Sequence, residues 1–279
     1  MSNNLIYFFN LKFELIYIYK DIQTYIIVIM EGLRISVITA TAKLSKPINL
    51  ENLYKCLEVN DKIHYVEHKC ENKGYSVKLT RKTRKKREKK SFYNQVTIHV
   101  FDDKIVNLKI FNNGKLQMTG LKSVESGKRT IESFIREISD KNREVYEGDD
   151  LEYSDYKIAM INSDFDIKYK VNRDCLHRCV VDMGMCSSYE PTIYPGVNMK
   201  YYYNTNNTNG ICCCNAMCDG KGNANGDGNC KRVTIAVFNS GKIIITGGND
   251  LKQLKTCHKF ISGVLKDRKK YEMVDYETK

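Results

Sequence analysis

This sequence of 279 residues contains no long, uninterrupted apolar run. Its most apolar stretch, residues 5–30, is broken by Lys12, Glu14, Lys20 and Asp21. A membrane-spanning helix needs about 20 predominantly apolar residues, and a secretory signal needs an unbroken apolar segment. The sequence therefore predicts neither feature, and we expect no membrane partner.

The common motifs of enzymes are missing as well. The sequence has no phosphate-binding Walker loop, no HExxH zinc motif, and no Ser/His/Asp or paired-carboxylate arrangement. We therefore predict no catalytic residues, no cofactor and no enzyme activity.

A disulfide framework is also absent, because the eleven cysteines are not spaced for one. This favours free thiols in a reducing compartment. The run Cys212-Cys213-Cys214 with Cys218 lacks two Cys-x2-Cys pairs and has no histidine nearby. We therefore predict no metal site and favour unstructured thiols, with a zinc knuckle as the alternative.

Acidic residues are fewer than basic ones. The chain has 33 Asp and Glu against 45 Lys and Arg, a formal net charge of +12 and a pI near 9.0. This balance favours a polyanionic partner such as nucleic acid, although a basic protein can also simply be soluble.

What the sequence does contain is an internal repeat. Residues 34–53 align without a gap with residues 157–176, at an offset of 123. Residues 106–120 align with residues 233–247, at an offset of 127. Two segments in the same order at nearly one offset indicate two similar structural units, whereas a solenoid needs three or more short repeats. We therefore predict a pseudo-twofold protein whose function uses both halves.

Each repeat has the same order of expected elements. A β-branched strand at residues 35–41 is followed by a helix whose N-cap is Asn49, and Asn172 is its equivalent in the second repeat. Three strands and a closing amphipathic helix come next. The expected strands are residues 95–101, 105–111 and 115–119 in the first repeat, and residues 197–203, 232–238 and 242–246 in the second. This pattern predicts an α+β fold with about eight strands.

Segments outside the repeat define the expected organisation. Met30 directly precedes the first repeat, so we expect translation to start there or residues 1–29 to be a dispensable extension; the alternative is an amphipathic helix packed on the domain. The basic run at residues 78–90 holds nine basic residues in thirteen and favours contact with flanking DNA, with a localisation signal or a solvated loop as alternatives. The Asn- and Gly-rich residues 204–229 are expected to form a mobile hairpin tip. The complete division is a first repeat at 30–140 with a basic insertion at 69–91, an acidic linker at 141–155, a second repeat at 156–268 with an insertion at 204–229, and a tail at 269–279.

Three stretches resemble the TATA-box-binding protein family. Residues 187–196, Ser-Ser-Tyr-Glu-Pro-Thr-Ile-Tyr-Pro-Gly, resemble the segment leading into the second stirrup loop of that family. Residues 111–122 and 238–247, which both begin with Phe-Asn and continue to Gly-Lys, resemble its two signature hairpins. The resemblance implies an α+β fold: a pseudo-twofold saddle of two curved antiparallel repeats, about ten strands in all, with helices on the convex face. The Lys-, Asn- and Ile-rich composition is typical of a large DNA virus or an AT-rich eukaryote.

The resemblance also implies how DNA is bound. Members of the family wedge paired phenylalanines into the minor groove of A·T-rich promoter DNA, bend the DNA and recruit initiation factors. Phe111 and Phe238 match one aromatic of each pair, and Tyr194 matches the second aromatic of the second repeat. In the first repeat an ungapped count reaches Asn94, which is not aromatic; Phe92 or Tyr93 could serve instead, and we favour Phe92 as the wedge there.

The other implied DNA-binding positions lie on strands. The two central asparagines of the family correspond to Val37 and Met160 here, while polar residues stand two places on, at Thr39 and Asn162. Either the central hydrogen bonds have moved by that step or they are lost. The remaining positions implied on the groove-facing strands are Lys115, Gln117, Thr119, Lys242, Ile244 and Thr246. Of these, the lysines are expected to contact phosphate, and Gln117 departs from the usual small apolar residue.

Glu190 is the position implied to contact a transcription factor IIB-like partner and, through it, the RNA polymerase machinery. Three alternatives to a promoter factor stay open: a minor-groove architectural protein without TATA specificity, an accessory DNA-binding part of a nuclease or glycosylase system, and a protein-only adaptor. A viral protein would act in a cytoplasmic factory or virion, and a cellular one in the nucleus.

Overall fold

The computed structural model describes only part of the chain. The described residues are 32–75, 92–139, 144–148, 150–266 and 274–275. The expected extension at residues 1–29 and the basic run at residues 78–90 lie outside them. Among the described residues, no helix has the length and hydropathy needed to cross a membrane.

Two units make up the fold. One consists of residues 36–162 with 247–251, and the other is built mainly from residues 163–246 with the segment from 252 onward. We call them the first-repeat unit and the second-repeat unit. The two-repeat architecture predicted from the sequence is therefore confirmed.

The first-repeat unit is an antiparallel sheet with two helices. Its strands are hydrogen-bonded in the order β3-β2-β4-β5-β6-β1-β7. The elements are β1 (Arg34–Leu44), α2 (Leu50–Cys56), β2 (Ile63–His68), β3 (Glu71–Gly74), β4 (Gln95–Asp102), β5 (Lys104–Phe111), β6 (Lys115–Leu121), α3 (Val124–Ser139) and β7 (Tyr153–Asp166), whose end enters the second-repeat unit.

The second-repeat unit has the same plan. Its strands follow the order β7-β12-β11-β10-β9, and a separate two-stranded ladder joins β8 to β13. The elements are β8 (Tyr169–Lys170), α4 (Arg173–Asp182), β9 (Cys186–Glu190), β10 (Tyr194–Tyr203), β11 (Lys231–Val237), β12 (Lys242–Gly248), α5 (Leu251–Val264) and β13 (Val274–Asp275).

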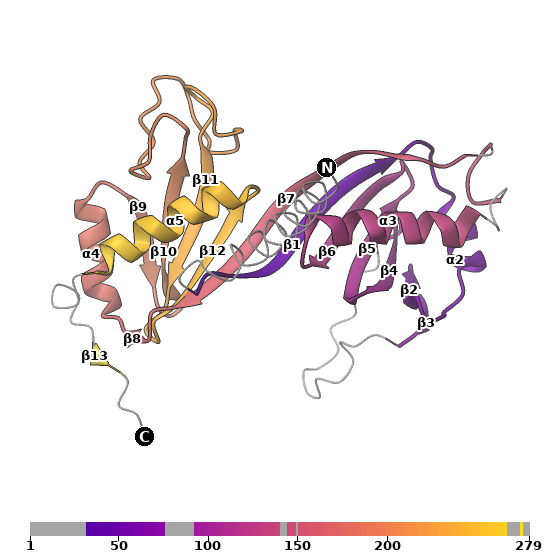
Figure 1. Cartoon of the computed structure of the whole chain (residues 1–279), viewed down its shortest axis with the longest axis horizontal. Helices are drawn as coiled ribbons and strands as arrows, with labels where there is room; N and C mark the ends of the chain where they lie inside the picture. Colours follow the sequence, from indigo (N-terminus) through magenta and orange to yellow (C-terminus); the bar gives the residue numbers. More distant parts are fainter. Residues whose placement is uncertain (1–31, 76–91, 140–143, 149, 267–273, 276–279) are drawn as a thin grey trace, which may run out of the picture. The chain divides into compact units, whose positions relative to one another are not determined.

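In each unit the core lies between one face of the sheet and the long helix. Figure 1 shows α3 lying across β4, β5 and β6, and α5 lying across the strands of its own unit. Phe134 of α3 and Leu108 of β5 are 0% exposed, as are Cys257 of α5 and Ile245 of β12. Burying a large apolar side chain contributes about 1.5–3 kcal/mol, so these stripes hold each helix on its sheet.

Equivalent hydrogen bonds show that the repeat extends to local structure. The amide of Ile48 donates to the carbonyl of Asn112 at 2.9 Å, and the amide of Val171 donates to Asn239 at 3.0 Å. The predicted N-caps are confirmed too. The side chain of Asn49 accepts from the third residue of α2, and that of Asn172 does the same in α4.

The strands that the sequence analysis did not assign are β2, β3, β8, β9 and β13. The main sheet of the described residues contains eleven strands, one more than the resemblance implied, and the two-stranded ladder of β8 and β13 is separate from it. The additional strand is β3, which forms inside the expected insertion at residues 69–91. Its sequence, Glu-Asn-Lys-Gly, has little strand propensity, so pairing with β2 rather than local preference determines it.

The insertion at residues 204–229 also differs from the expected mobile, coreless tip. Ala224 is 3% exposed, and Cys230, directly after the insertion, is 2% exposed. The amide of Thr205 donates to Ala224 at 2.9 Å, and that of Gly222 donates to Cys230 at 3.0 Å. The insertion is therefore a folded loop between β10 and β11 (Figure 1).

Candidate nucleic-acid interface

Alternation along β6 sorts its residues between two faces of the sheet. Leu116 and Met118 are buried at 1% and 0% exposure beneath the helices. Lys115, Gln117 and Thr119 point to the other side. In each unit, the described helices cover one face of the sheet. We call the other face of that sheet the opposite face of the unit.

The neighbouring strand β1 brings further predicted residues to the same face. Thr39 pairs with Thr119, Thr41 with Gln117, and Lys43 with Lys115. The pairing register of β1 with β6 shifts between Ile38 and Thr39. The Ile38 side chain is only 3% exposed and lies on the face of the sheet that the helices cover. Alternation therefore places Val37 on the opposite face together with Thr39.

Strand β7 presents Met160 and Asn162 in the same way. Phe165 is buried, and its ring lies 4.4 Å from that of His258 in α5. Ile161, which alternates in phase with Phe165, is also buried, so the even-numbered neighbours Met160 and Asn162 point away from the helices. All the predicted strand positions on β1, β6 and β7 therefore lie on the opposite face.

In the second-repeat unit, Ile244 and Thr246 lie on the opposite face, and so do residues that the sequence analysis did not select. Thr246 pairs with Thr234, and Ile244 pairs with Ala236. Ala236 in turn pairs with Asn198. The alternation that begins at Tyr194 already assigns Asn198 and Lys200 to one face, and this period-two signal could have identified them.

Three polar atoms of these strands have no hydrogen-bond partner in the described structure. They are Thr41 Oγ1, Asn162 Oδ1 and Asn198 Oδ1, and all three are buried. An unsatisfied buried polar atom costs about 1–3 kcal/mol. Each therefore reduces the stability of the fold without a visible compensating contact in the described structure.

An aromatic pair stands at one end of the second-repeat sheet. The rings of Tyr194 and Phe238 lie 5.7 Å apart at an angle of 64°. Gly196 lies beneath them, where an added Cβ would come within 3.0 Å of the Tyr194 ring and 3.2 Å of the Phe238 ring. Tyr194 is 40% exposed, so the pair presents apolar edges to solvent.

The turn that carries Phe238 has its counterpart at Phe111. Gly241 donates to the Phe238 carbonyl at 3.0 Å, and Gly114 donates to the Phe111 carbonyl at 3.0 Å. Both glycines have positive φ, 75° and 77°, a conformation that favours glycine. The Asn-x-Gly signature of each repeat therefore forms the same turn.

The partner of Phe111 differs from the one favoured by the sequence analysis. Phe111 pairs with Gln95, just as the register of β10 and β11 places Phe238 beside Gly196. Tyr194 stands two residues before Gly196, and the residue two before Gln95 is Tyr93, not Phe92 or Asn94. Tyr93 and Phe92 are 71% and 65% exposed. The register therefore favours Tyr93 as the second aromatic of the first repeat.

Basic side chains lie close together on the opposite face. Lys43 and Lys115 are exposed and stand directly across from each other on β1 and β6. Like charges in such a pair are destabilising unless an anion lies near them. In the second-repeat unit, burial and the nearby Arg232 lower the pKa of Lys200, whose Nζ donates to Thr234 Oγ1 at 3.1 Å.

Glu190 lies in a tight turn before β10. The amide of Ile193 donates to its carbonyl at 3.0 Å, and Thr192 Oγ1 donates to its carboxylate at 2.6 Å. The Ile193 side chain is 84% exposed. The turn thus presents one carboxylate and one large apolar side chain to solvent.

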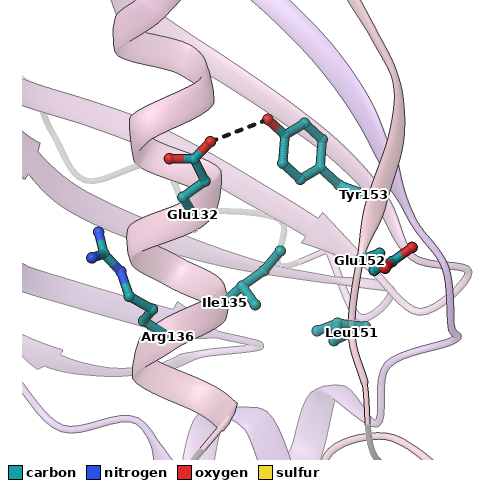
Figure 2. Close-up of a pocket in the computed structure, with 6 residues that line it drawn as sticks. All are labelled: Glu132, Ile135, Arg136, Leu151, Glu152 and Tyr153. Atoms are coloured by element: carbon teal, nitrogen blue, oxygen red, sulfur yellow. Dashed lines mark hydrogen bonds between the residues drawn. The ribbon is translucent and has the colours of Figure 1, made fainter.

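The first-repeat unit also has an open pocket of about 570 Å³ between α3 and the start of β7. Figure 2 shows Glu132 of α3 facing Tyr153, whose hydroxyl donates to it at 3.5 Å. Burial and Glu132 raise the pKa of Tyr153. Its lining also holds Glu152 and the guanidinium group of Arg136, so both signs of charge are present in the pocket.

Known proteins share this architecture. A sequence model of the family described as transcription factor TFIID, or TATA-binding protein, matches residues 32–141 and 155–268. The TATA-box-binding protein-like protein of Acanthamoeba polyphaga mimivirus is 31% identical over 251 residues, which cover 84% of this chain and 65% of the relative. This viral relative agrees with the origin suggested by composition.

Cellular relatives are more distant. TATA-box-binding protein 2 of Entamoeba histolytica is 24% identical over 59% of this chain and 60% of its own length. The TATA-box-binding protein of Tetrahymena thermophila is 26% identical over 60% of this chain and 52% of its own length. The chain thus spans less than two thirds of the length of these relatives and of the viral one.

Among solved structures, Methanococcus jannaschii TBP matches with a TM-score of 0.51 at 21% identity, over 85% of this chain and 99% of that one. This likeness concerns the fold, and it confirms the predicted α+β class.

Proposed function

Since the chain belongs to the TATA-binding protein family, we propose that it binds the minor groove of A·T-rich double-stranded DNA and bends it to initiate transcription. TATA-binding protein is itself a standard example of a minor-groove protein whose apolar wedges enter base steps and kink the duplex. The proposal therefore requires that this chain has exposed apolar side chains that can act as such wedges.

The observation that carries the proposal is the aromatic pair of Tyr194 and Phe238. Its rings are partly exposed, lie above a glycine and are fixed by a backbone turn. The first-repeat unit repeats the turn at Phe111, with Tyr93 exposed two residues before β4. A wedge that unstacks bases needs this combination of a rigid base and an exposed apolar edge.

The residues of the opposite face supply the rest of the proposed contact. Asn162 and Asn198 carry Nδ2 donors, which would pair with the adenine N3 and thymine O2 acceptors of the minor groove. Lys43, Lys115 and Lys242 are exposed and would pair with phosphate. Ile244 and Thr246 would pack against the groove floor, where apolar contact disfavours the guanine amino group.

The test is a fluorescence assay of bending with an end-labelled A·T-rich duplex. The double variant Phe111→Ala/Phe238→Ala is expected to lose bending, because base stacking on an aromatic is worth about 1–3 kcal/mol per base. The matched control is Phe111→Leu/Phe238→Leu, which keeps an apolar wedge and should retain most of the bending. Equal bending by wild type and the alanine variant would overturn the proposal.

A second function, an architectural protein without TATA preference, is favoured by Val37, Met160 and Gln117. All three lie on the opposite face at positions where the family resemblance implies other residues. Competition between A·T-rich and random duplexes decides between the two functions. A preference of tenfold or more for A·T-rich duplexes would exclude the architectural alternative.

We further propose that the turn at Glu190 contacts a transcription factor IIB-like protein and, through it, the polymerase. Its exposed carboxylate and the exposed Ile193 match the composition of a small protein contact. An adaptor that acts only through proteins would show no DNA affinity at low salt. An accessory part of a nuclease or glycosylase system would stimulate strand or base cleavage by its partner enzyme.

The viral relative suggests where this happens. We propose that the protein acts in a cytoplasmic viral factory or the virion, with the nucleus expected only for a cellular origin. Immunofluorescence against newly made viral DNA tests this, and exclusively nuclear staining would contradict it.

A further inference from the structure

A cluster of thiols lies in the loop between β10 and β11. The sulfur atoms of Cys212, Cys214, Cys218 and Cys230 all lie within 4.8 Å of one another. The Cys214 and Cys230 sulfurs are 3.5 Å apart, and those of Cys230 and Cys212 are 3.9 Å apart. A disulfide needs about 2.05 Å, so these are four separate sulfur ligands converging on one point.

The spacing of the sulfurs fits one tetrahedral metal ion. Four thiolates at about 2.3 Å from a central Zn²⁺ stand roughly 3.8 Å from one another. Two of the sulfur-to-sulfur distances in the loop, 3.5 Å and 3.9 Å, lie on either side of that value, and all of them are within 4.8 Å. An all-sulfur tetrahedral site is typical of zinc or of iron.

The loop needs such a centre because it buries so little apolar surface. Its residues are mainly Asn and Gly, and Met217 is 99% exposed. Ordering the backbone costs about 1–2 kcal/mol per residue, which hydrophobic burial normally offsets. A structural metal ion supplies that stabilisation directly, as in small zinc domains that fold only with metal.

Polar groups around the sulfurs form the second layer of the site. Asn204 is 6% exposed and directs its Nδ2 at the Cys230 sulfur, 3.6 Å away. The Asp227 carboxylate accepts from the amides of Asn215 and Ala216, at 2.8 and 2.9 Å, and so shapes the turn between Cys214 and Cys218. Donors and carboxylates of this kind orient the ligands of protein metal sites.

Backbone amides also point at the sulfurs. Burial acts to raise the pKa of Cys218, but the amides of Gly220 and Cys230 outweigh it and lower that pKa. Burial raises the pKa of Cys230 to about 12. Hydrogen bonds from backbone amides favour the thiolate form of a cysteine, which is the form that binds a metal ion.

We propose that Cys212, Cys214, Cys218 and Cys230 bind one structural Zn²⁺ ion. All four coordination positions come from the protein, so the site is closed and has no place for a substrate. It lies at the end of the β10–β11 hairpin opposite Tyr194 and Phe238, because the loop joins the ends of those strands that are farthest from the aromatic pair (Figure 1). The inference is therefore independent of DNA binding.

The sequence analysis favoured unstructured thiols because the spacing Cys-x-Cys-x3-Cys-x11-Cys contains no Cys-x2-Cys pair. The fold brings the cysteines together through the turns of the loop instead. Cys213, in the middle of the run, is exposed and lies outside the cluster.

Elemental analysis of the purified full chain tests the proposal. We expect about one zinc per chain in wild type and in the control variant Cys213→Ser, and a loss of most zinc in Cys214→Ser and Cys218→Ser. Cobalt substitution should give the visible absorption of a tetrahedral thiolate site. A metal content that is the same in all variants, or wild type that holds no metal after reconstitution, would overturn the proposal.

A second measurement does not depend on how well the variants fold. Wild type stripped with a chelator should be cut by protease within residues 204–230 much faster than the zinc-loaded protein, and adding zinc back should restore protection. Cleavage that is indifferent to zinc, or mass spectrometry showing the four cysteines joined as two disulfides, would contradict a metal site.

Discussion

Replacing Thr41 with valine should make the protein more stable while weakening its function. Thr41 Oγ1 is buried in the opposite face of the first-repeat sheet and has no hydrogen-bond partner in the described structure. Valine has nearly the same shape and suits a strand equally well, so the change removes the hydroxyl and little else.

The size of the effect follows from two contributions. An unsatisfied buried hydroxyl costs about 1–3 kcal/mol, and burying a methyl group in its place adds about 0.8 kcal/mol. Partial exposure of the residue reduces both, so we expect Thr41→Val to raise the free energy of unfolding by about 1–2 kcal/mol. At about 2–4 °C per kcal/mol, the melting temperature rises by roughly 2–8 °C.

Thermal unfolding followed by circular dichroism measures this change. The matched control is Thr130→Val, since Thr130 is 0% exposed but its hydroxyl donates to the Ser126 carbonyl at 2.8 Å. That variant loses a made hydrogen bond and should be less stable than wild type. If Thr41→Val also lowered the melting temperature, the Thr41 hydroxyl would have a partner in the folded protein and the reasoning would fail.

The same variant reports on function. If the hydroxyl of Thr41 pairs with an acceptor on a base edge, its loss should weaken binding to an A·T-rich duplex by about 2- to 12-fold, the equivalent of 0.5–1.5 kcal/mol. A variant that is more stable and binds DNA as tightly as wild type would remove this position from the interface.

Three further predictions concern other parts of the molecule. Hydrogen bonds from Arg129 and Ser126 lower the pKa of Asp102, although burial acts to raise it. This interaction therefore stabilises the fold fully above the ordinary carboxyl pKa, and the stabilisation is lost as the pH falls through the lowered pKa. Asp102→Asn should flatten the acid side of a curve of unfolding free energy against pH, and an unchanged curve would contradict this. Lys115→Ala should reduce the slope of log K against log salt for DNA by about 0.9, since one phosphate contact is lost; Lys122→Ala, just beyond the other end of β6, is the comparison. Glu190→Arg should abolish binding of a transcription factor IIB-like protein to the DNA complex in a gel-shift assay while leaving DNA affinity within about twofold; equal recruitment would place the contact elsewhere.

Local patterns were sufficient to predict much of this fold. The N-cap asparagines, the Asn-x-Gly turns and the period-two strands are decided by residues close together in the sequence, and Asn49 and Asn172 cap their helices as expected. Strand β3 could not be predicted in this way, because only its pairing with β2 makes Glu71–Gly74 extended.

The candidate sites show the same limit. Alternation placed Thr119 and Thr246 on one face of their sheets, but the correspondence of Tyr93 with Tyr194 needed the register of β4 with β5. The thiol cluster could not be predicted from the sequence, because Cys230 lies twelve positions after Cys218 and the turns that bring them together have no simple sequence signature.

The backbone hydrogen bonds that join each aromatic turn to the segment just before the first helix of its repeat have a consequence for divergence. The Ile48-to-Asn112 and Val171-to-Asn239 bonds join main-chain atoms, which every amino acid except proline provides in the same form. Substitutions along these segments can therefore accumulate without moving the turn, provided that its glycine remains. Side chains that face a ligand can then change in evolution while the backbone beneath them keeps its structure. The fold can therefore be shared by proteins that are only 21% identical.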